Sequence, residues 1–188
     1  MSNLYIITPP VLKVSDIHTE LDLLTRTLPV GAVRLRLAKG FDGPSLITGF
    51  QEIVQNRDIA LLVEDDLEFA AKAGADGVHL TNPVRVAEAR RLLGDDASIG
   101  AHCFASRHMA MEAGEAGADY VAFSPANAPE VIELIGWWSD MTNLPCVAEG
   151  VADELTARRV MEAGADFIAF TLGEADPAAL AAVANRKL

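Results

Sequence analysis

Lys72-Ala73-Gly74-Ala75-Asp76-Gly77-Val78-His79-Leu80 is a segment whose Ala-Gly-Ala-Asp core recurs at 116–119 and 163–166, and this repeat indicates the fold. Each copy follows an alanine-rich segment and precedes a short apolar run. The glycine is typical of a helix end with positive φ, and the apolar run is typical of a buried strand. The copies lie 43 and 47 residues apart, which is too long for one strand-helix unit and suits two. The repeat therefore indicates parallel strands joined by helices.

Strand-like and helix-like segments alternate along the whole chain. We expect strands at 4–8, 32–37, 59–63, 77–80, 98–101, 120–123, 145–148 and 167–171. We expect helices at 16–28, 43–56, 66–73, 83–93, 106–116, 130–141, 153–163 and from 176 onward, with Asp16 and Asp153 as N-caps. This alternation predicts an α/β fold, a single-domain (β/α)8 TIM barrel with short loops over residues 1–188. The alternative, an open doubly wound sheet, lacks the glycine-rich dinucleotide turn that it needs after the first strand.

The composition excludes several classes of protein. The chain has 188 residues, 51% of them hydrophobic and 22% charged, as expected for one globular domain. No apolar run approaches the roughly 20 residues of a membrane helix, and no basic leader is seen, so we expect a cytoplasmic protein without membrane contact. A net charge of −12 argues against nucleic acid as a partner but permits a small phosphorylated molecule. The two cysteines, Cys103 and Cys146, are expected to be reduced core residues.

In a (β/α)8 barrel the chemistry lies at the carboxyl ends of the strands. The Ala-Gly-Ala-Asp turns precede strands, so we expect them at the opposite end, with a role in packing and turn geometry. The polar residues where strands are expected to end are the candidates for a functional site: Thr8, Arg36, Glu64, Asp65, His79, Thr81, Asn82, His102, Ser124, Glu149, Gly150, Thr171 and Gly173.

Charged residues on the second strand need partners inside a narrow barrel. Strand alternation puts Arg34 and Arg36 on the same face, so both point into the barrel or both point toward the helices. If they point inward, Glu64 on the next strand is the expected counter-charge. The sequence leaves open whether the arginines bind a ligand or form only internal salt bridges.

We expect different roles for the two histidines near strand ends. His79 is expected to be a core histidine with satisfied hydrogen bonds. His102, next to Cys103, is a candidate general acid/base or metal ligand, because the reference pKa of histidine lies near neutral. Trp137 and Trp138 occupy adjacent positions of a helix and cannot both face the barrel. We therefore expect them to serve as a packing anchor or as a contact in a homo-oligomer.

The opening Leu4-Tyr5-Ile6-Ile7-Thr8, the segment Leu61-Leu62-Val63-Glu64-Asp65-Asp66 and the run Gly74-Ala75-Asp76-Gly77-Val78-His79-Leu80 carry a family resemblance. With Ile99-Gly100 and the later Gly-Ala-Asp phrases, they resemble the thiamine phosphate synthase family, which includes the thiazole tautomerases. The resemblance covers nearly the whole chain. It implies a TIM barrel that joins a hydroxymethylpyrimidine diphosphate to a thiazole phosphate with Mg²⁺ and expels pyrophosphate.

The resemblance also implies roles for individual residues. Arg36 matches the arginine that grips the diphosphate, Lys39 is the nearby lysine displaced by one position, and Asp65 matches a magnesium ligand. Together with Arg34, which replaces a glutamine of the family, and the polar strand end Thr8, the candidate substrate-binding set is Arg34, Arg36, Lys39, Thr8, Gly150, Thr171 and Gly173, the glycines as possible backbone donors.

Several positions depart from the family pattern. Glu64 replaces an asparagine and His102 replaces a phosphate-binding serine. Thr81-Asn82-Pro83-Val84 lacks the second magnesium carboxylate, Ser124-Pro125-Ala126-Asn127 lacks a lysine loop, and Glu149 stands in a shortened turn. Three hypotheses follow: a working thiamine phosphate synthase, a diverged barrel that acts on another small phosphorylated ligand with His102 and Glu64 as catalytic acid/base, or a non-catalytic homologue that binds a ligand or a protein.

Overall fold

The computed structural model describes residues 4–11, 13, 15, 17–54, 57–124 and 126–184. The strands are β1 (Leu4–Ile7), β2 (Val30–Leu35), β3 (Ala60–Glu64), β4 (Gly77–Leu80), β5 (Ser98–His102), β6 (Tyr120–Phe123), β7 (Cys146–Ala148) and β8 (Phe167–Thr171). The helices are α1 (His18–Thr27), α2 (Gly43–Val54), α3 (Leu67–Ala73), the 3-10 turn η2 (Pro83–Arg85), α4 (Val86–Leu93), α5 (Arg107–Glu115), α6 (Ala128–Met141), α7 (Glu154–Glu162) and α8 (Pro177–Ala184).

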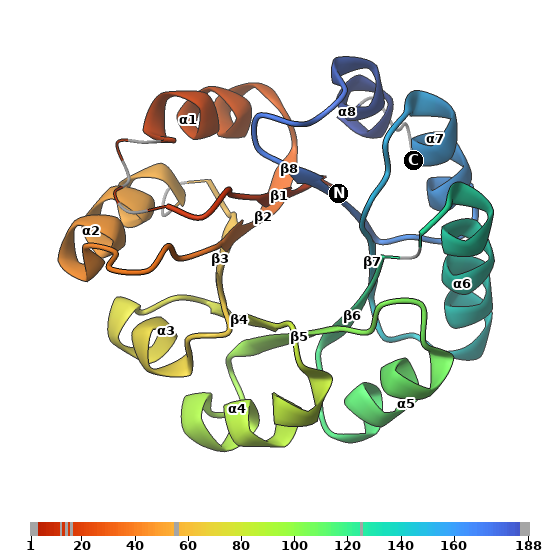
Figure 1. Ribbon diagram of the computed structural model, residues 1–188, viewed down its shortest axis with the longest axis horizontal. Coiled ribbons are helices and arrows are strands. Elements are labelled where there is room, and N and C mark those ends of the chain that lie inside the picture. Colours follow the sequence, from red (N-terminus) through yellow and green to blue (C-terminus); the bar gives the residue numbers. More distant parts are fainter. Residues whose placement is uncertain are drawn as a thin grey trace.

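The strands pair in parallel, each with its neighbours in sequence, and β1 pairs with β8 to close a barrel. Figure 1 shows the ring of strands enclosed by the helices. The predicted (β/α)8 TIM barrel is confirmed. Most expected elements are present with ends that differ by one or two residues.

The clearest boundary error is in the second strand. It was expected at 32–37 but runs from Val30 to Leu35. The strand is interrupted at Arg36, whose backbone N–H donates to the Thr8 side chain at 3.0 Å, and Leu37 then forms an isolated parallel bridge with Val11. The expected helix at 83–93 begins as a 3-10 turn, in which the Asn82 side chain accepts from the Val84 N–H. The predicted cap Asp16, the expected end of α2 at Asn56, and Pro125 lie outside the described residues.

The three Ala-Gly-Ala-Asp turns have the predicted geometry. Gly74, Gly117 and Gly164 have φ values of 61°, 96° and 109°. Each aspartate that follows also ties two strands together. The Asp76 carboxylate accepts from the Leu61 N–H of β3 at 2.7 Å, and Asp119 and Asp166 do the same for β5 and β7. The repeat therefore fixes the amino-terminal end of the barrel, as expected.

The core has an outer layer between barrel and helices and an inner layer inside the barrel. The inner layer consists of Tyr5, Ile7, Ala32, Leu62, Tyr120, Ala122, Val147 and Ala169. Gly100 on β5 makes room for the Tyr120 ring, because a Cβ at Gly100 would lie 1.9 Å from Tyr120 Cζ. The two tyrosines fill the barrel below its mouth and support the polar groups above them.

Trp138 is buried in its own chain at 2% exposure, and its indole N–H donates to the Leu144 carbonyl at 2.7 Å. Trp137 is half-buried, with the Arg107 guanidinium 5.0 Å from its ring centroid. The packing role is thus confirmed for Trp138, and the homo-oligomer stays a prediction.

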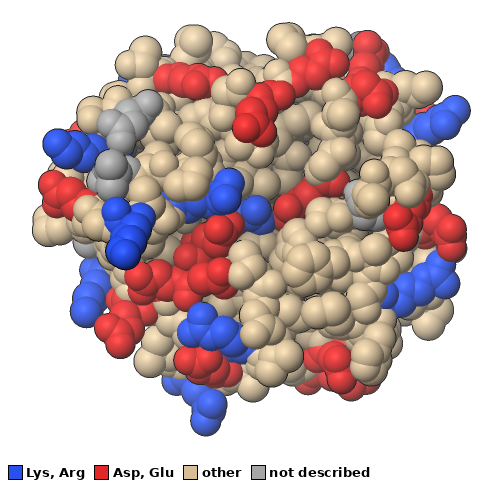
Figure 2. All heavy atoms as spheres, viewed as in Figure 1, with Lys and Arg blue, Asp and Glu red and all other residues tan. Residues whose placement is uncertain are grey.

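Within the described residues, no helix is long and apolar enough to cross a membrane. Figure 2 shows acidic and basic side chains side by side near the middle of the viewed face.

Candidate functional site

Arg34 lies at the centre of the barrel mouth and is almost fully buried at 7% exposure. Its Nη1 donates to Glu149 Oε1 at 2.8 Å, and its Nε lies 3.1 Å from Glu64 Oε2. Glu149 follows β7 and is positioned by its own N–H, which donates to the Phe123 carbonyl at 2.8 Å. The arginines therefore point inward, and the predicted pairing with Glu64 is confirmed. The sequence did not reveal Glu149 as the closer partner.

Arg36 lies above Arg34 and is more exposed. Its Nε is 3.4 Å from Glu64 Oε1, so Glu64 bridges both guanidiniums. The Arg36 side chain keeps 38% of its surface exposed, compared with 8% for Arg34. Arg36 is therefore the arginine of this pair that can still reach a ligand. Thr8 is fully buried and accepts the backbone N–H of Arg36, so the structure gives it a positioning role.

His79 on β4 lies beneath the arginines and is fully buried. Its Nδ1 is 3.0 Å from the Tyr120 hydroxyl, which in turn lies 3.0 Å from the Tyr5 hydroxyl. Burial, followed by the charge of Arg34, holds the pKa of His79 well below its usual 6.5, so the ring is neutral. Its Nε2 has no hydrogen-bond partner among the described residues. The expectation of a satisfied core histidine is therefore right for Nδ1 and wrong for Nε2.

His102 ends β5 and faces the mouth. Its Nε2 lies 2.9 Å from Ser124 Oγ, and its Nδ1 lies 3.6 Å from Glu149 Oε1. The half-exposed ring of Phe104 packs edge-on against it, with centroids 4.4 Å apart. Cys103 does not take part, because it is fully buried and burial raises the pKa of its thiol to about 12. Both cysteines are free and buried, as expected.

Glu149 joins these groups electrostatically. Burial by itself would raise the pKa of its carboxyl, but the nearby His102 side chain and the positive charge of Arg34 lower it to about 2. Glu149 is therefore an anion at neutral pH. Since this carboxylate neutralises Arg34, the mouth holds less net positive charge than its two arginines suggest.

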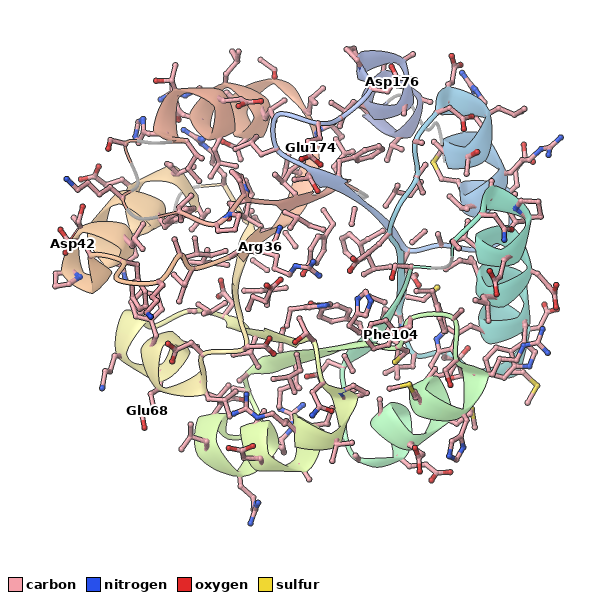
Figure 3. All side chains as sticks on the ribbon, in the orientation of Figure 1. Arg36, Asp42, Glu68, Phe104, Glu174 and Asp176 are labelled. Atoms are coloured by element: carbon pink, nitrogen blue, oxygen red, sulfur yellow. The ribbon has the colours of Figure 1, made fainter. Side chains whose placement is uncertain are left out.

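A pocket of about 440 Å³ opens at the mouth beside these residues. It brings together four of the predicted ligand-binding residues: Arg34, Arg36, Gly150 and Thr171. Acidic residues also line it: Glu149, Glu174 and Asp176. Arg36, Glu174 and Phe104 lie around the barrel opening in Figure 3. Gly173 lines a smaller neighbouring pocket of about 230 Å³, which it shares with Thr171.

Lys39 and Asp65 lie in a different pocket, of about 760 Å³, which is also lined by Glu64 and Arg85. The Asp65 carboxylate accepts from the Thr81 N–H at 2.9 Å and from the Thr81 hydroxyl. Magnesium requires several oxygen ligands. Both Glu64 oxygens face arginines and both Asp65 oxygens face Thr81, so these residues do not fit a protein-held magnesium ion.

A closed barrel with arginines and carboxylates gathered at the carboxyl ends of its strands is typical of the (β/α)8 proteins that bind small polar ligands there. Sequence comparison narrows this class. A profile described as thiamine monophosphate synthase matches residues 4–173, so the chain belongs to the thiamine monophosphate synthase family. The resemblance noted in the sequence is thereby confirmed.

Two curated relatives support the same assignment. The thiamine-phosphate synthase of Rhodospirillum centenum is 40% identical, with 97% of this chain and 96% of the relative covered. That of Hyphomonas neptunium is 40% identical over 92% of this chain and 85% of the relative.

Solved structures share the fold at lower identity. Thiamine phosphate pyrophosphorylase from Pyrococcus furiosus has a TM-score of 0.72 at 23% identity, covering 97% of this chain and 92% of that one. Orotidine 5'-phosphate decarboxylase from Pyrococcus horikoshii has a TM-score of 0.67 at 16% identity, covering 96% and 95%. At these identities the comparison shows only that the fold is shared.

Proposed function

We propose that this protein acts in thiamine biosynthesis as a thiamine phosphate synthase-type transferase. In this reaction the bond between a hydroxymethylpyrimidine and its diphosphate breaks, a bond to a thiazole phosphate forms, and pyrophosphate leaves. The observation that carries the proposal is the 40% identity to a named thiamine-phosphate synthase over 97% of this chain. The pocket at the carboxyl ends of β2, β7 and β8 supports it, because this is where barrel enzymes bind substrates.

The described side chains suggest how the pocket would hold the substrates. Arg36 is half-exposed at the rim and would bind phosphate oxygens through its guanidinium. Gly150 has a φ of 73° and no atom near the position of a Cβ, so its N–H can approach a phosphate closely. Thr171 would add a hydroxyl from β8, and Lys39 and Gly173 would contribute from the adjoining pockets.

Of the two residues considered for proton transfer, His102 is better placed than Glu64. His102 is partly exposed toward the mouth, with Ser124 at one ring nitrogen and Glu149 near the other, and in the metal-free protein it is the candidate to exchange a proton with a bound ligand. Glu64 is held between Arg34 and Arg36, and we propose that its main effect is to orient Arg36.

A second candidate function is favoured by the acidic lining of the same pocket. Glu149 neutralises Arg34, and Glu174 and Asp176 lie on the rim, so Arg36 has few cationic neighbours. A pocket of this charge suits a ligand with one small anionic group better than two phosphorylated substrates. The alternative is therefore a diverged barrel that acts on, or only binds, another small phosphorylated molecule.

The remaining proposals concern the setting of the protein. We propose that it works in the cytoplasm, in keeping with its two free thiols. Its partners would be small phosphorylated molecules and further copies of itself, without nucleic acid or membrane. The family resemblance implies Mg²⁺. Glu64 pairs with Arg36 and Asp65 accepts from the Thr81 N–H, so the proposed reaction assigns no role to a magnesium ion held by these two carboxylates.

The test is a thiamine phosphate formation assay with both substrates, run with and without magnesium. We expect product from the wild type and at least a tenfold lower kcat/KM for Arg36→Ala, since a charge-assisted hydrogen bond of about 1.5 kcal/mol or more is lost. Arg107→Ala is the matched control, because Arg107 pairs with Glu133 on the outside of the barrel and should keep full activity. Product formation unaffected by Arg36→Ala would remove Arg36 from the site. Absence of product, with binding of inorganic phosphate by calorimetry, would favour the second candidate.

A further inference from the structure

Three side chains at the barrel mouth surround one point. They are His79 from β4, His102 from β5 and Glu149 after β7. His79 Nε2 lies 3.9 Å from Glu149 Oε1, and His102 Nδ1 lies 3.6 Å from the same oxygen. Each residue offers one ligand atom, and these atoms lie within 4.8 Å of one another. We propose that His79, His102 and Glu149 form a binding site for a single transition-metal ion, with zinc as the preferred metal.

The other nitrogen of each histidine is already engaged. His79 Nδ1 contacts the Tyr120 hydroxyl at 3.0 Å, and His102 Nε2 contacts the Ser124 hydroxyl at 2.9 Å. Histidines that bind metals are commonly oriented in this way, because a hydrogen bond on one nitrogen fixes the ring and leaves the lone pair of the other for the ion. The two rings therefore present Nε2 of His79 and Nδ1 of His102 toward Glu149.

The unpartnered Nε2 of His79 is the second observation that points to a ligand. The residue is fully buried, and within the described part of the chain this nitrogen makes no hydrogen bond. If Nδ1 carries the proton, the Nε2 lone pair faces the Glu149 carboxylate at 3.9 Å, and two electron-rich atoms then need a cation between them. If Nε2 carries the proton, the same distance is too long for a hydrogen bond. A metal ion bound to the first tautomer removes the cost of burying this nitrogen unpaired.

The spacing suits zinc with small adjustments. Bonds of about 2.0–2.2 Å in a tetrahedral site place neighbouring ligand atoms roughly 3.4 Å apart. The two distances to Glu149 Oε1, 3.6 Å and 3.9 Å, are close to this value, and the two histidine nitrogens lie within 4.8 Å of each other and would move closer on binding. Two imidazoles and one carboxylate form a typical zinc set that leaves a fourth position open. Of the three proposed ligands, Glu149 lines the 440 Å³ pocket, so this residue connects the metal site to it.

The charges around the cluster leave room for a cation. Arg34 is the group that disfavours one, since its Nη1 is 2.8 Å from Glu149 Oε1. Glu64 offsets that charge at 3.1 Å from Arg34 Nε. Because both arginines are paired with carboxylates, a bound metal would provide the positive charge that an anionic ligand needs at the open position. Imidazole ligands favour zinc and similar ions over magnesium.

The test uses the full-length chain with any affinity tag removed, stripped of metal with a chelator and titrated with Zn²⁺ by calorimetry. Binding of Co²⁺ is followed in parallel by visible absorption, which reports tetrahedral coordination. The variants are His102→Gln and His79→Gln. The matched control is His108→Gln, since His108 is exposed on α5 and pairs only with the exposed Glu112 among the contacts seen. Near-ultraviolet circular dichroism checks the folding of each protein.

We expect one Zn²⁺ per chain in the wild type and in His108→Gln, and at least a hundredfold weaker binding in His102→Gln. His102 is partly exposed, so this variant tests the site even if His79→Gln does not fold. Zinc binding that is absent from the wild type, or equal in folded His102→Gln, would overturn the proposal and leave water as the partner of His79. Because no substrate is present, this result is independent of the transferase assay.

Discussion

Arg34 and Glu149, 115 residues apart in the sequence, form a buried ion pair with Nη1 and Oε1 2.8 Å apart across the barrel mouth. The pair connects β2 with the end of β7, and it exists because closure of the barrel brings these segments face to face. It fixes Arg34 beneath the pocket and leaves Arg36 as the more exposed of the two arginines. The chemistry available at the mouth depends on this arrangement.

Removal of the Glu149 charge should destabilise the protein. We expect Glu149→Gln to lower the free energy of unfolding by about 3 kcal/mol, since breaking a buried pair leaves an uncompensated charge, although Glu64 still contacts Arg34. The measurement is urea denaturation at pH 7. The control is Glu133→Gln, which removes an exposed pair with Arg107 and should cost less than about 1 kcal/mol. Equal effects of the two substitutions would show that the buried pair adds nothing.

The pH dependence of stability should report the neutral His79. The folded-state pKa lies below 6.5, so only the unfolded chain takes up a proton at this residue as the pH falls through that value. Stability is then complete above pH 6.5 and decreases below it. Glu149 adds a further loss between its reference value of 4.5 and about 2. In denaturation curves of the metal-free protein at pH 7.5 and 5.5, His79→Gln should reduce the difference in stability between the two pH values, and His108→Gln should not. An unchanged slope in His79→Gln would contradict a buried neutral histidine.

Gly100 should be sensitive to a single methyl group. A Cβ there would lie 1.9 Å from Tyr120 Cζ, so Gly100→Ala should displace the ring that holds His79 and cost roughly 2–3 kcal/mol. Gly114→Ala is the control within α5, where the nearest atom lies at 3.4 Å. It should be neutral or stabilising by about 0.5–1 kcal/mol, because alanine favours helix. The measurement is thermal denaturation of both variants. If Gly100→Ala leaves the stability unchanged, Tyr120 does not occupy this space.

The aspartate of the repeated turn should contribute to stability at the end of the barrel far from the pocket. Asp76→Ala leaves the Leu61 N–H without its acceptor and should cost about 1–3 kcal/mol. Asp95→Ala, on an exposed loop, should change stability by less than about 0.5 kcal/mol. Both are compared by chemical denaturation. If the two variants unfold at the same denaturant concentration, the turn aspartates do not hold the strands.

Local patterns were sufficient to predict the fold. The Ala-Gly-Ala-Asp phrase contains a helix end, a left-handed glycine and a strand start, and each depends on neighbouring residues alone. Strand parity was enough to place Arg34 and Arg36 on one face and to select Glu64 as their partner, because adjacent parallel strands bring these positions together. The end of β2 was predicted two residues too late because the Arg36 N–H donates to the Thr8 hydroxyl and interrupts the strand before the isolated bridge at Leu37.

The rest of the site depends on long-range geometry. Glu149 lies beyond the end of β7, and only the closed barrel shows that its side chain turns inward to Arg34. Tyr120 was counted as an ordinary strand residue. The glycine at position 100 on the adjacent strand was a signal that a large ring fills the barrel there. The unpaired nitrogen of His79 could not be predicted, since it follows from distances to Glu149 and Tyr120 together.

The most direct test of the proposed function is the stoichiometry of the wild-type reaction. Purified protein is mixed with hydroxymethylpyrimidine diphosphate and thiazole phosphate, and thiamine phosphate and pyrophosphate are measured in the same samples. We expect both products to appear in equal amounts and in proportion to the enzyme added. No thiamine phosphate at any enzyme concentration, with the protein folded and both substrates intact, would contradict a thiamine phosphate synthase.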